Sequence, residues 1–121
     1  MASEGRQRAT VRRSEAADHD LAQIFEHLVD AYAALGEAPA EALERAAARV
    51  RGIEDDMERL ADAPHQGTLC PDVAPDLRRV TKRGAVFYFV TDLAAQRLDV
   101  IAVFFGGQDH LRRMLARLLR E

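Results

Sequence analysis

The chain has 121 residues, of which 48% are hydrophobic and 31% are charged. This length is typical of one domain, and the composition excludes an intrinsically disordered chain. The single cysteine, Cys70, cannot form an internal disulfide, which excludes a disulfide-stapled secreted scaffold and favours the reducing cytoplasm. No stretch approaches the ~18 apolar residues that cross a membrane. The first 13 residues also lack the apolar core of a signal peptide, so neither secretion nor membrane insertion is expected.

The net charge of −3 conceals an asymmetry along the chain. Residues 1–77 hold 8 basic and 16 acidic side chains, whereas residues 78–121 hold 9 basic and 4 acidic ones. Such an asymmetry has two interpretations, which are a charged partner for one half or complementarity of the two halves within the fold.

The N-terminal part predicts a strand followed by a helix. Residues 1–8 are polar and aperiodic and predict a disordered lead-in, which leaves 9–121 as a single domain. Residues 9–13 contain Thr and Val and predict an edge strand. Ser14 is a good N-cap, and Gly36 is a good helix terminator. Acids near the helix start, Glu15, Asp18 and Asp20, favour the positive end of the helix dipole. The apolar stripe between these limits is Leu21, Ile24, Phe25, Leu28, Val29, Tyr32 and Leu35.

A second helix is predicted from Pro39, which suits a first turn, to Pro64, which stops a helix. Its apolar stripe is Leu43, Ala46, Val50, Ile53, Met57 and Leu60. The connection between the two helices is so short that they must form an antiparallel hairpin.

After a loop at 63–76 the hydrophobic period changes from 3.6 to 2 and predicts strands at 77–82, 85–91 and 98–105. Short connections make these strands an antiparallel meander, and Asp109 is a candidate cap for a final helix. The order β-α-α-β-β-β-α predicts the α+β class, with the helical hairpin packed on an antiparallel sheet. The expected common core is Ile24, Leu28, Val50, Ile53, Val90 and Ile101.

The sequence carries no familiar cofactor or metal motif. Gly106-Gly107 lacks the lysine of a phosphate-binding loop, and His19 and His27 lie two helical turns apart, too far to share a metal ion. His65 and Cys70 are only two ligands, and Asp109 beside His110 is better explained as a helix cap. We therefore expect neither a cofactor nor a metal.

The most informative chemical feature is a set of cations. They surround the first meander strand and line the predicted last helix, at Arg78, Arg79, Lys82, Arg83, Arg112, Arg113, Arg117 and Arg120. Strand alternation places Arg79 on the face opposite Arg78 and Lys82, so that only part of the set can share a surface. Such a surface suits phosphates or an acidic partner, and the alternative is a solvated face.

The order and the local motifs of the chain resemble the RelE/ParE superfamily of type II toxin–antitoxin toxins. The resemblance covers residues 9–119 and rests on SEAADHDLAQIFEHL, on ERL-ADAPHQGT, on PDLRRV, and on VFYFV followed by VIAVFFGGQD. The joint order and spacing of these pieces make the resemblance to the superfamily specific. Within it the chain looks like the ParE-like, plasmid-stabilisation branch, because it lacks residues that the ribonuclease members use. The resemblance implies a small cytoplasmic toxin that a cognate antitoxin neutralises.

The family has two activities, which are ribosome-dependent cleavage of mRNA and inhibition of DNA gyrase. At the positions where the ribonuclease members carry cationic or proton-transfer groups, this chain has Ala85, Phe105 and Gln108. These side chains cannot act as acid, base or phosphate clamp. The resemblance thus favours a gyrase-binding toxin without chemistry of its own. A ribonuclease that uses Arg83, Tyr88 and His110, and which alone would bind nucleic acid directly, is one alternative. A non-toxic partner-binding member is the other.

For the antitoxin or the target, the resemblance implies contacts through the basic set. The residues predicted for such contacts are Arg78, Arg79, Lys82, Arg83, Arg112, Arg113 and Arg117.

Overall fold

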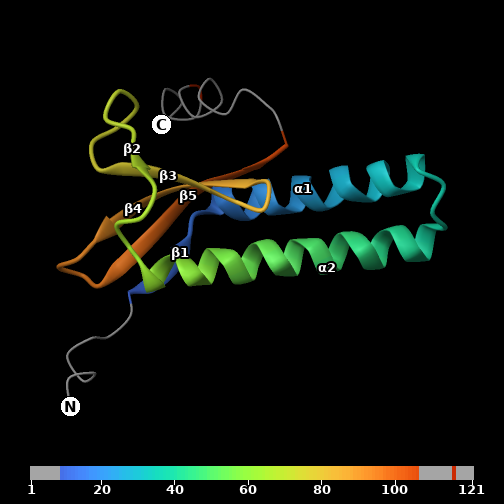
Figure 1. Ribbon diagram of the computed structural model, residues 1–121, viewed down its shortest axis with the longest axis horizontal. Coiled ribbons are helices and arrows are strands. Elements are labelled where there is room, and N and C mark those ends of the chain that lie inside the picture. Colours follow the sequence, from blue (N-terminus) through green and yellow to red (C-terminus); the bar gives the residue numbers. More distant parts are fainter. Residues whose placement is uncertain (1–8, 107–115, 117–121) are drawn as a thin grey trace, which may run out of the picture.

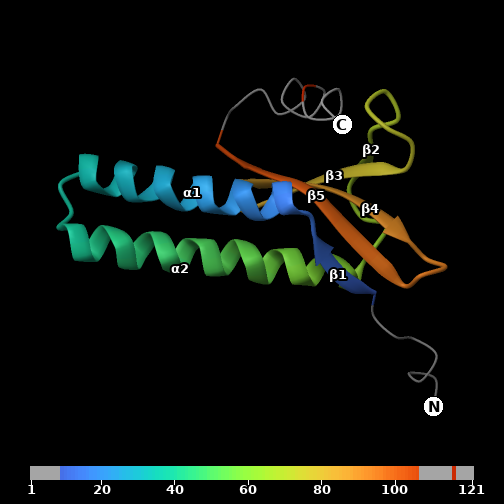
Figure 2. The same ribbon diagram turned by 180° about the vertical axis from the view of Figure 1, so that it is seen from behind.

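The computed structural model describes residues 9–106 and Ala116, and Figure 1 shows their arrangement. A helical hairpin lies against one face of a five-stranded sheet, and the end of the hairpin at the α1–α2 connection extends past the sheet, as the reverse view in Figure 2 also shows. The elements are β1 (Thr10–Arg13), α1 (Glu15–Ala34), α2 (Pro39–Glu58), a 3₁₀ helix (Arg59–Asp62), β2 (Thr68–Leu69), β3 (Leu77–Lys82), β4 (Ala85–Asp92) and β5 (Arg97–Phe105). The predicted α+β class is confirmed. The predicted lead-in at 1–8 and the final helix after Asp109 lie outside the described residues.

The starts of both helices and the end of α1 follow from local chemistry, as predicted, whereas α2 ends at Glu58 and a 3₁₀ helix takes the place of the last turn expected before Pro64. The Ser14 hydroxyl accepts a hydrogen bond from the Ala17 amide at 3.0 Å and caps α1. Gly36 follows the helix with a φ of 97°, a conformation that glycine adopts at little cost. Pro39 is the first residue of α2, where its missing N–H would have no partner in any case.

The strand order is β1-β5-β4-β3-β2, and β3, β4 and β5 form the predicted antiparallel meander. Two features differ from the expected sheet. The loop at 63–76 contains the two-residue strand β2, which pairs antiparallel with β3. The edge strand β1 pairs parallel with β5, so the sheet is mixed rather than purely antiparallel. The start of α1 fixes this direction, because the Ser14 amide donates to the Val100 carbonyl at 3.1 Å and its hydroxyl donates to the Ile101 carbonyl at 3.1 Å.

A β-bulge in β5 changes which side chains face the helices. Tyr88 of β4 pairs with Ala102, but the next residue, Phe89, pairs with Val100, so Ile101 is an extra residue in β5. Before the bulge the even-numbered residue Val100 packs with the helices. After the bulge the odd-numbered residue Val103 does so, because one extra residue reverses the alternation.

The bulge and the alternation produce two apolar clusters instead of one. Ile24, Leu28 and Ile53 are buried between the helices and the sheet, as predicted, and Val50 packs partly buried against them. Val90 and Ile101 are only half-buried and belong to a second cluster on the far face of the sheet. The prediction of one common core for all six residues was therefore wrong. The second cluster is built on Leu77, Val86, Tyr88, Ala102 and Phe104.

Within the described residues, neither long helix is apolar enough to cross a membrane.

The two clusters predict unequal costs of truncation. Ile24→Ala should lower the free energy of unfolding by about 2–5 kcal/mol, because the side chain is 6% exposed and lies between helix and sheet. Ile101→Ala should cost less than about 2 kcal/mol, because its side chain is only half-buried. Urea denaturation followed by circular dichroism measures both values. Equal losses would contradict the separation of the two clusters.

Candidate functional site

The predicted basic site begins on β3, whose pairing with β4 fixes the direction of each cation. Arg79 pairs with Tyr88 and shares the far face of the sheet with it, whereas Arg78 pairs with Phe89 and shares the helix-covered face. Lys82 pairs with Ala85 on the helix-covered face. Arg79 thus lies on the face of the sheet opposite Arg78 and Lys82, as predicted.

The cations of β3 also differ in how they are engaged. Arg78 is half-buried as a residue, and its Nη1 donates to the His65 carbonyl at 2.7 Å, which holds the segment before β2 against the sheet. Arg79 is exposed. The backbone carbonyl of Arg79 packs against Gly67. A Cβ atom added at Gly67 would lie only 2.5 Å from this carbonyl oxygen. Among the β3 cations, Arg79 therefore presents the most accessible charge.

Arg83 occupies the tight turn between β3 and β4. Arg83 and Gly84 have φ values of 49° and 89°, and two positive values are the mark of a two-residue hairpin turn. The Arg83 guanidinium turns toward α2, where Nε and Nη2 lie 3.0 and 2.9 Å from the Asp56 carboxylate. Nη2 also donates to the Gly52 carbonyl at 3.3 Å. Since the Arg83 side chain is 66% exposed, this ion pair contributes at most about 1 kcal/mol.

A second arginine strengthens the contact between the turn and α2. Arg49 donates from Nη2 to the Arg83 carbonyl at 2.9 Å, and its guanidinium carbon lies 5.1 Å from the centroid of the Phe105 ring. The two arginines thus attach the β3–β4 turn to α2, on the side of the sheet that the hairpin covers.

Tyr88, a second candidate of the ribonuclease alternative, is a core residue. Its side chain is 0% exposed, and its ring meets Phe104 edge to face, with centroids 5.9 Å apart. Its hydroxyl is buried and has no hydrogen-bond partner among the residues that the structure describes. A hydroxyl in this state costs stability of about 1–3 kcal/mol and cannot reach a substrate.

The structure separates Arg83 from Tyr88. The arginine lies at the turn and points to the helix side, whereas the tyrosine faces the other side of the sheet. Tyr88 is also four residues beyond Gly84, about 13 Å along the strand at ~3.3 Å per residue. His110, the third candidate, and the cations Arg112, Arg113 and Arg117 lie outside the described residues. The described part of the chain therefore does not assemble the predicted acid–base set.

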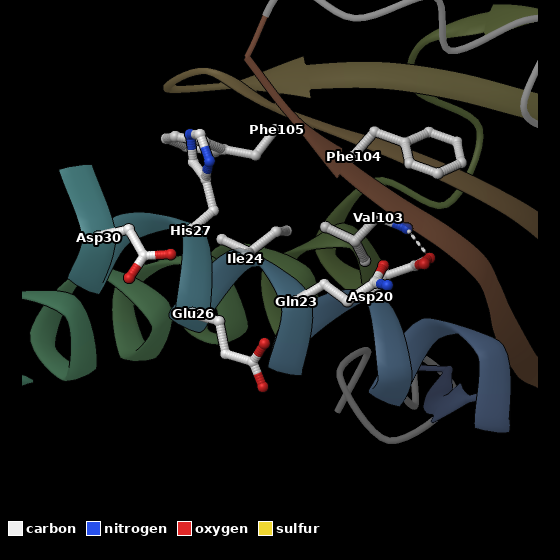
Figure 3. A pocket seen from close by; sticks show the side chains of 9 residues that line it. All are labelled: Asp20, Gln23, Ile24, Glu26, His27, Asp30, Val103, Phe104 and Phe105. Carbon is white, nitrogen blue, oxygen red and sulfur yellow. Dashed lines mark hydrogen bonds between the residues drawn. The ribbon is translucent and has the colours of Figure 1, made fainter.

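A cleft of about 360 Å³ between α1 and the end of β5 was not predicted (Figure 3). Its lining is Asp20, Gln23, Ile24, Glu26, His27, Asp30, Val103, Phe104 and Phe105. Asp20 was predicted to serve the helix dipole, but it is 4% exposed and its Oδ2 accepts from the Val103 amide at 3.0 Å. One signal was present in the sequence, since Asp20 falls on the same helical face as Ala17 and Ile24.

The described residues contain no group of three His, Cys, Asp or Glu side chains that could hold a metal ion. Cys70 packs against the second apolar cluster, and its thiol lies 3.6 Å from the Thr68 carbonyl. The described part of the site therefore offers two chemical features. One is the exposed cation Arg79 beside the second apolar cluster, and the other is the buried carboxylate of Asp20, which accepts a hydrogen bond from β5.

Comparison with solved structures shows a likeness of fold. No family model and no curated protein match the sequence. A chain of the solved structure "Chromosomal ParDE TA system from P. aeruginosa" matches with a TM-score of 0.59 and 19% sequence identity. The match covers 82% of this chain and 97% of that chain. The two chains share a fold. The predicted fold, a helical hairpin packed on a sheet, is confirmed at this level.

Substitution of Tyr88 separates a core role from a catalytic one. Tyr88→Phe keeps the ring contact with Phe104 and removes the unpaired hydroxyl, so the midpoint of thermal unfolding should stay equal or rise. Growth inhibition on induction should be unchanged. Tyr88→Ala should lose about 3–5 kcal/mol of stability, because it leaves a cavity. A fully folded Tyr88→Phe variant without growth inhibition would assign the hydroxyl a direct role.

Proposed function

We propose that this protein is the toxin of a type II toxin–antitoxin module. The observation that carries the proposal is the fold shared with a chain of a ParDE toxin–antitoxin structure over 82% of this chain. The sequence motifs that resemble the RelE/ParE superfamily support the same conclusion, because they lie in the residue order and do not depend on the fold comparison. An antitoxin encoded by the neighbouring reading frame is the expected partner.

Within this class we favour inhibition of DNA gyrase by binding over cleavage of mRNA. RNA cleavage needs a base for the 2′-hydroxyl, an acid for the leaving group and cations that stabilise the phosphorane. Ala85 is buried beside β5 and Phe105 lies under Arg49, and neither can supply such a group. Tyr88 is buried, and Arg83 is paired with Asp56 on the other side of the sheet.

A paired assay tests the target. Purified protein should lower the supercoiling activity of DNA gyrase in a titration, while ribosome-bound mRNA stays intact at the same concentrations. In cells, induction should stop DNA synthesis before protein synthesis. This order follows because a gyrase-bound toxin blocks replication and leaves translation to decline later.

The other outcomes of this assay have separate meanings. Cleaved mRNA with normal supercoiling would replace the gyrase proposal with the ribonuclease alternative. Absence of both effects, in a protein that still binds the product of the neighbouring frame, would assign the non-toxic partner-binding class.

For the antitoxin we propose a contact on the far face of the sheet, beside β3. Arg79 is exposed there, and the half-buried side chains of Val73, Val90 and Ile101 form the rim of the second apolar cluster. An apolar segment that carries an Asp or Glu would match this combination of surface and charge. Arg78, Lys82 and Arg83 sit on the helix-covered side, so in this proposal they support the strand and turn. Arg112, Arg113 and Arg117 stay candidates for the same partner.

Reversal of one charge tests this surface. Arg79→Glu should weaken binding of the antitoxin about tenfold, because it replaces an attraction by a repulsion at an exposed site. Arg12→Glu is the matched control, since Arg12 is also exposed but lies on β1 at the opposite edge of the sheet. Isothermal titration calorimetry with the product of the neighbouring frame measures both. Equal weakening by the two variants would contradict a localised contact at Arg79.

A further inference from the structure

A small pocket lies between α2 and the β3–β4 turn, on the side of the sheet that the hairpin covers. We call it the turn pocket. Its volume is about 140 Å³, and its lining is Ala48, Arg49, Gly52, Ile53, Asp56 and Arg83. This volume is well below the ~300–1,000 Å³ of pockets that take a whole drug-sized ligand. The turn pocket therefore suits one chemical group of a larger molecule.

Two glycines leave the space in which the arginine side chains of the turn pocket lie. A Cβ atom added at Gly52 of α2 would lie 3.6 Å from Nη2 of Arg83. A Cβ atom added at Gly84 of the turn would likewise lie 3.6 Å from Nη2 of Arg49. Each guanidinium thus rests on glycine backbone of the opposite element, and the two line the pocket from different directions.

Arg49 carries a charge that forms no salt bridge with the described residues. Its Nη2 donates to the Arg83 carbonyl at 2.9 Å, and its guanidinium carbon lies 5.1 Å from the centroid of the Phe105 ring. These two contacts hold an exposed side chain in one place. Within the described residues its hydrogen bond to Arg83 is the only one that it donates, so the other N–H groups of the guanidinium are available to a ligand.

Asp56 neutralises only part of the charge on the other wall of the pocket. Its Oδ2 lies 3.0 Å from Nε and 2.9 Å from Nη2 of Arg83, and its Oδ1 accepts from Nη1 of Arg59 at 3.2 Å. One carboxylate is therefore shared by two arginines. The lining itself has two guanidinium groups and one carboxylate, which leaves a net charge of +1 before the share of Arg59 is considered.

A phosphate group fits this arrangement better than a carboxylate does. A terminal phosphate carries about −1.5 to −2 charges at pH 7 and three acceptor oxygens, which two guanidinium groups can meet from different directions. A carboxylate carries one charge and offers its oxygens in one plane, so it pairs well with a single arginine. The small volume admits the phosphate and leaves the rest of its molecule outside.

The charge of the hairpin disfavours a long polyanion at the turn pocket. Residues 14–62 hold 13 acidic and 4 basic side chains, a net charge of −9. A duplex laid along α2 would bring many phosphates close to these carboxylates, and like charges repel within the ~8 Å screening length of physiological salt. A nucleotide or the end of a strand brings its charge to the pocket alone.

We propose that the turn pocket binds the terminal phosphate of a nucleotide or of a nucleic-acid strand, with Arg49 and Arg83 as the clamp. The one acid of the lining, Asp56, is held by two arginines, so the pocket binds a phosphate without cleaving it. It is separate from the Arg79 surface, which lies on the far face of the sheet. The inference goes beyond the proposed toxin function and does not depend on it.

Titration of the purified full chain, followed by ¹H–¹⁵N NMR spectra, tests the proposal. The probes are thymidine 5′-monophosphate and thymidine, which is the same molecule without the phosphate. The monophosphate should shift the amide signals of Gly52 and Gly84 to saturation with a Kd of about 0.1–1 mM, because these residues adjoin the two guanidinium groups. Thymidine should shift neither signal.

Two short strands distinguish the sources of the phosphate. They are hexamers of thymidine, one with a 5′-phosphate and one with a 5′-hydroxyl. The phosphorylated hexamer should bind at least about fivefold more tightly than the other. Binding of this hexamer together with the monophosphate supports a pocket for strand ends, and binding of the monophosphate alone supports a pocket for free nucleotides.

Variants locate the binding. Arg49→Gln should weaken the monophosphate at least about tenfold, because it removes the guanidinium that forms no salt bridge within the described residues. Arg51→Gln is the matched control and should leave the affinity within about twofold. It removes the same charge from the same helix, but Arg51 lies about 200° around α2 from Arg49.

A second pair of variants leaves both arginines in place. Ala48→Glu puts a carboxylate at the exposed rim of the turn pocket and should weaken the monophosphate about tenfold. Ala40→Glu makes the same change about 12 Å away along α2, beyond the screening length, and should have less than about a twofold effect. Thermal melts confirm that each variant is folded.

Three results would overturn the proposal. The first is an equal response to thymidine and to its monophosphate. The second is equal weakening by the folded variants Arg49→Gln and Arg51→Gln. The third is equal affinity for the two hexamers, because internal phosphodiesters would then be the ligand and the terminal phosphate would not.

Discussion

The junction between α1 and β5 is the constraint on which the rest of the structure depends. Three backbone groups of β5 are bound by the start of α1, through Ser14 to Val100 and Ile101 and through Asp20 to Val103. Without these contacts the bulge at Ile101 would leave backbone groups of β5 without partners at the edge that β1 does not cover. The hydrogen bonds from the Ser14 and Asp20 side chains to the bulged strand β5 fix the residue at which α1 starts. They also fix the direction in which α1 crosses the sheet.

The same junction determines which functional surfaces exist. With α1 placed across β5, α2 reaches the β3–β4 turn, where Arg49 and Arg83 attach the turn to the helix. The far face of the sheet keeps Arg79 beside a small apolar cluster, and the outer side of the hairpin keeps its acids. The exposed charge of Arg79 and the acids of the hairpin thus lie on opposite sides of one small domain.

Residues whose roles are set by their near neighbours could be predicted from the sequence. Ser14, Gly36 and Pro39 bound the helices, and the alternation of Arg78 and Arg79 follows from the strand period alone. What could not be predicted depends on partners far along the chain. The parallel direction of β1 is set by α1, the bulge at Ile101 has no signature in an all-apolar run, and Arg83 meets Asp56 across 27 residues. The burial of Tyr88 likewise depends on which face of β4 the loop at 63–76 covers.

The opposite charges of the hairpin and the sheet give the molecule an electric dipole. Within the described residues, 14–62 carry a net charge of −9, whereas 9–13 and 63–106 together carry +3. In the field of a polyanion such as duplex DNA, a torque would rotate the domain before contact, so that the sheet leads and the hairpin trails. A target that holds nucleic acid would therefore meet the sheet side first, and the hairpin would stay accessible to a different protein at the same time.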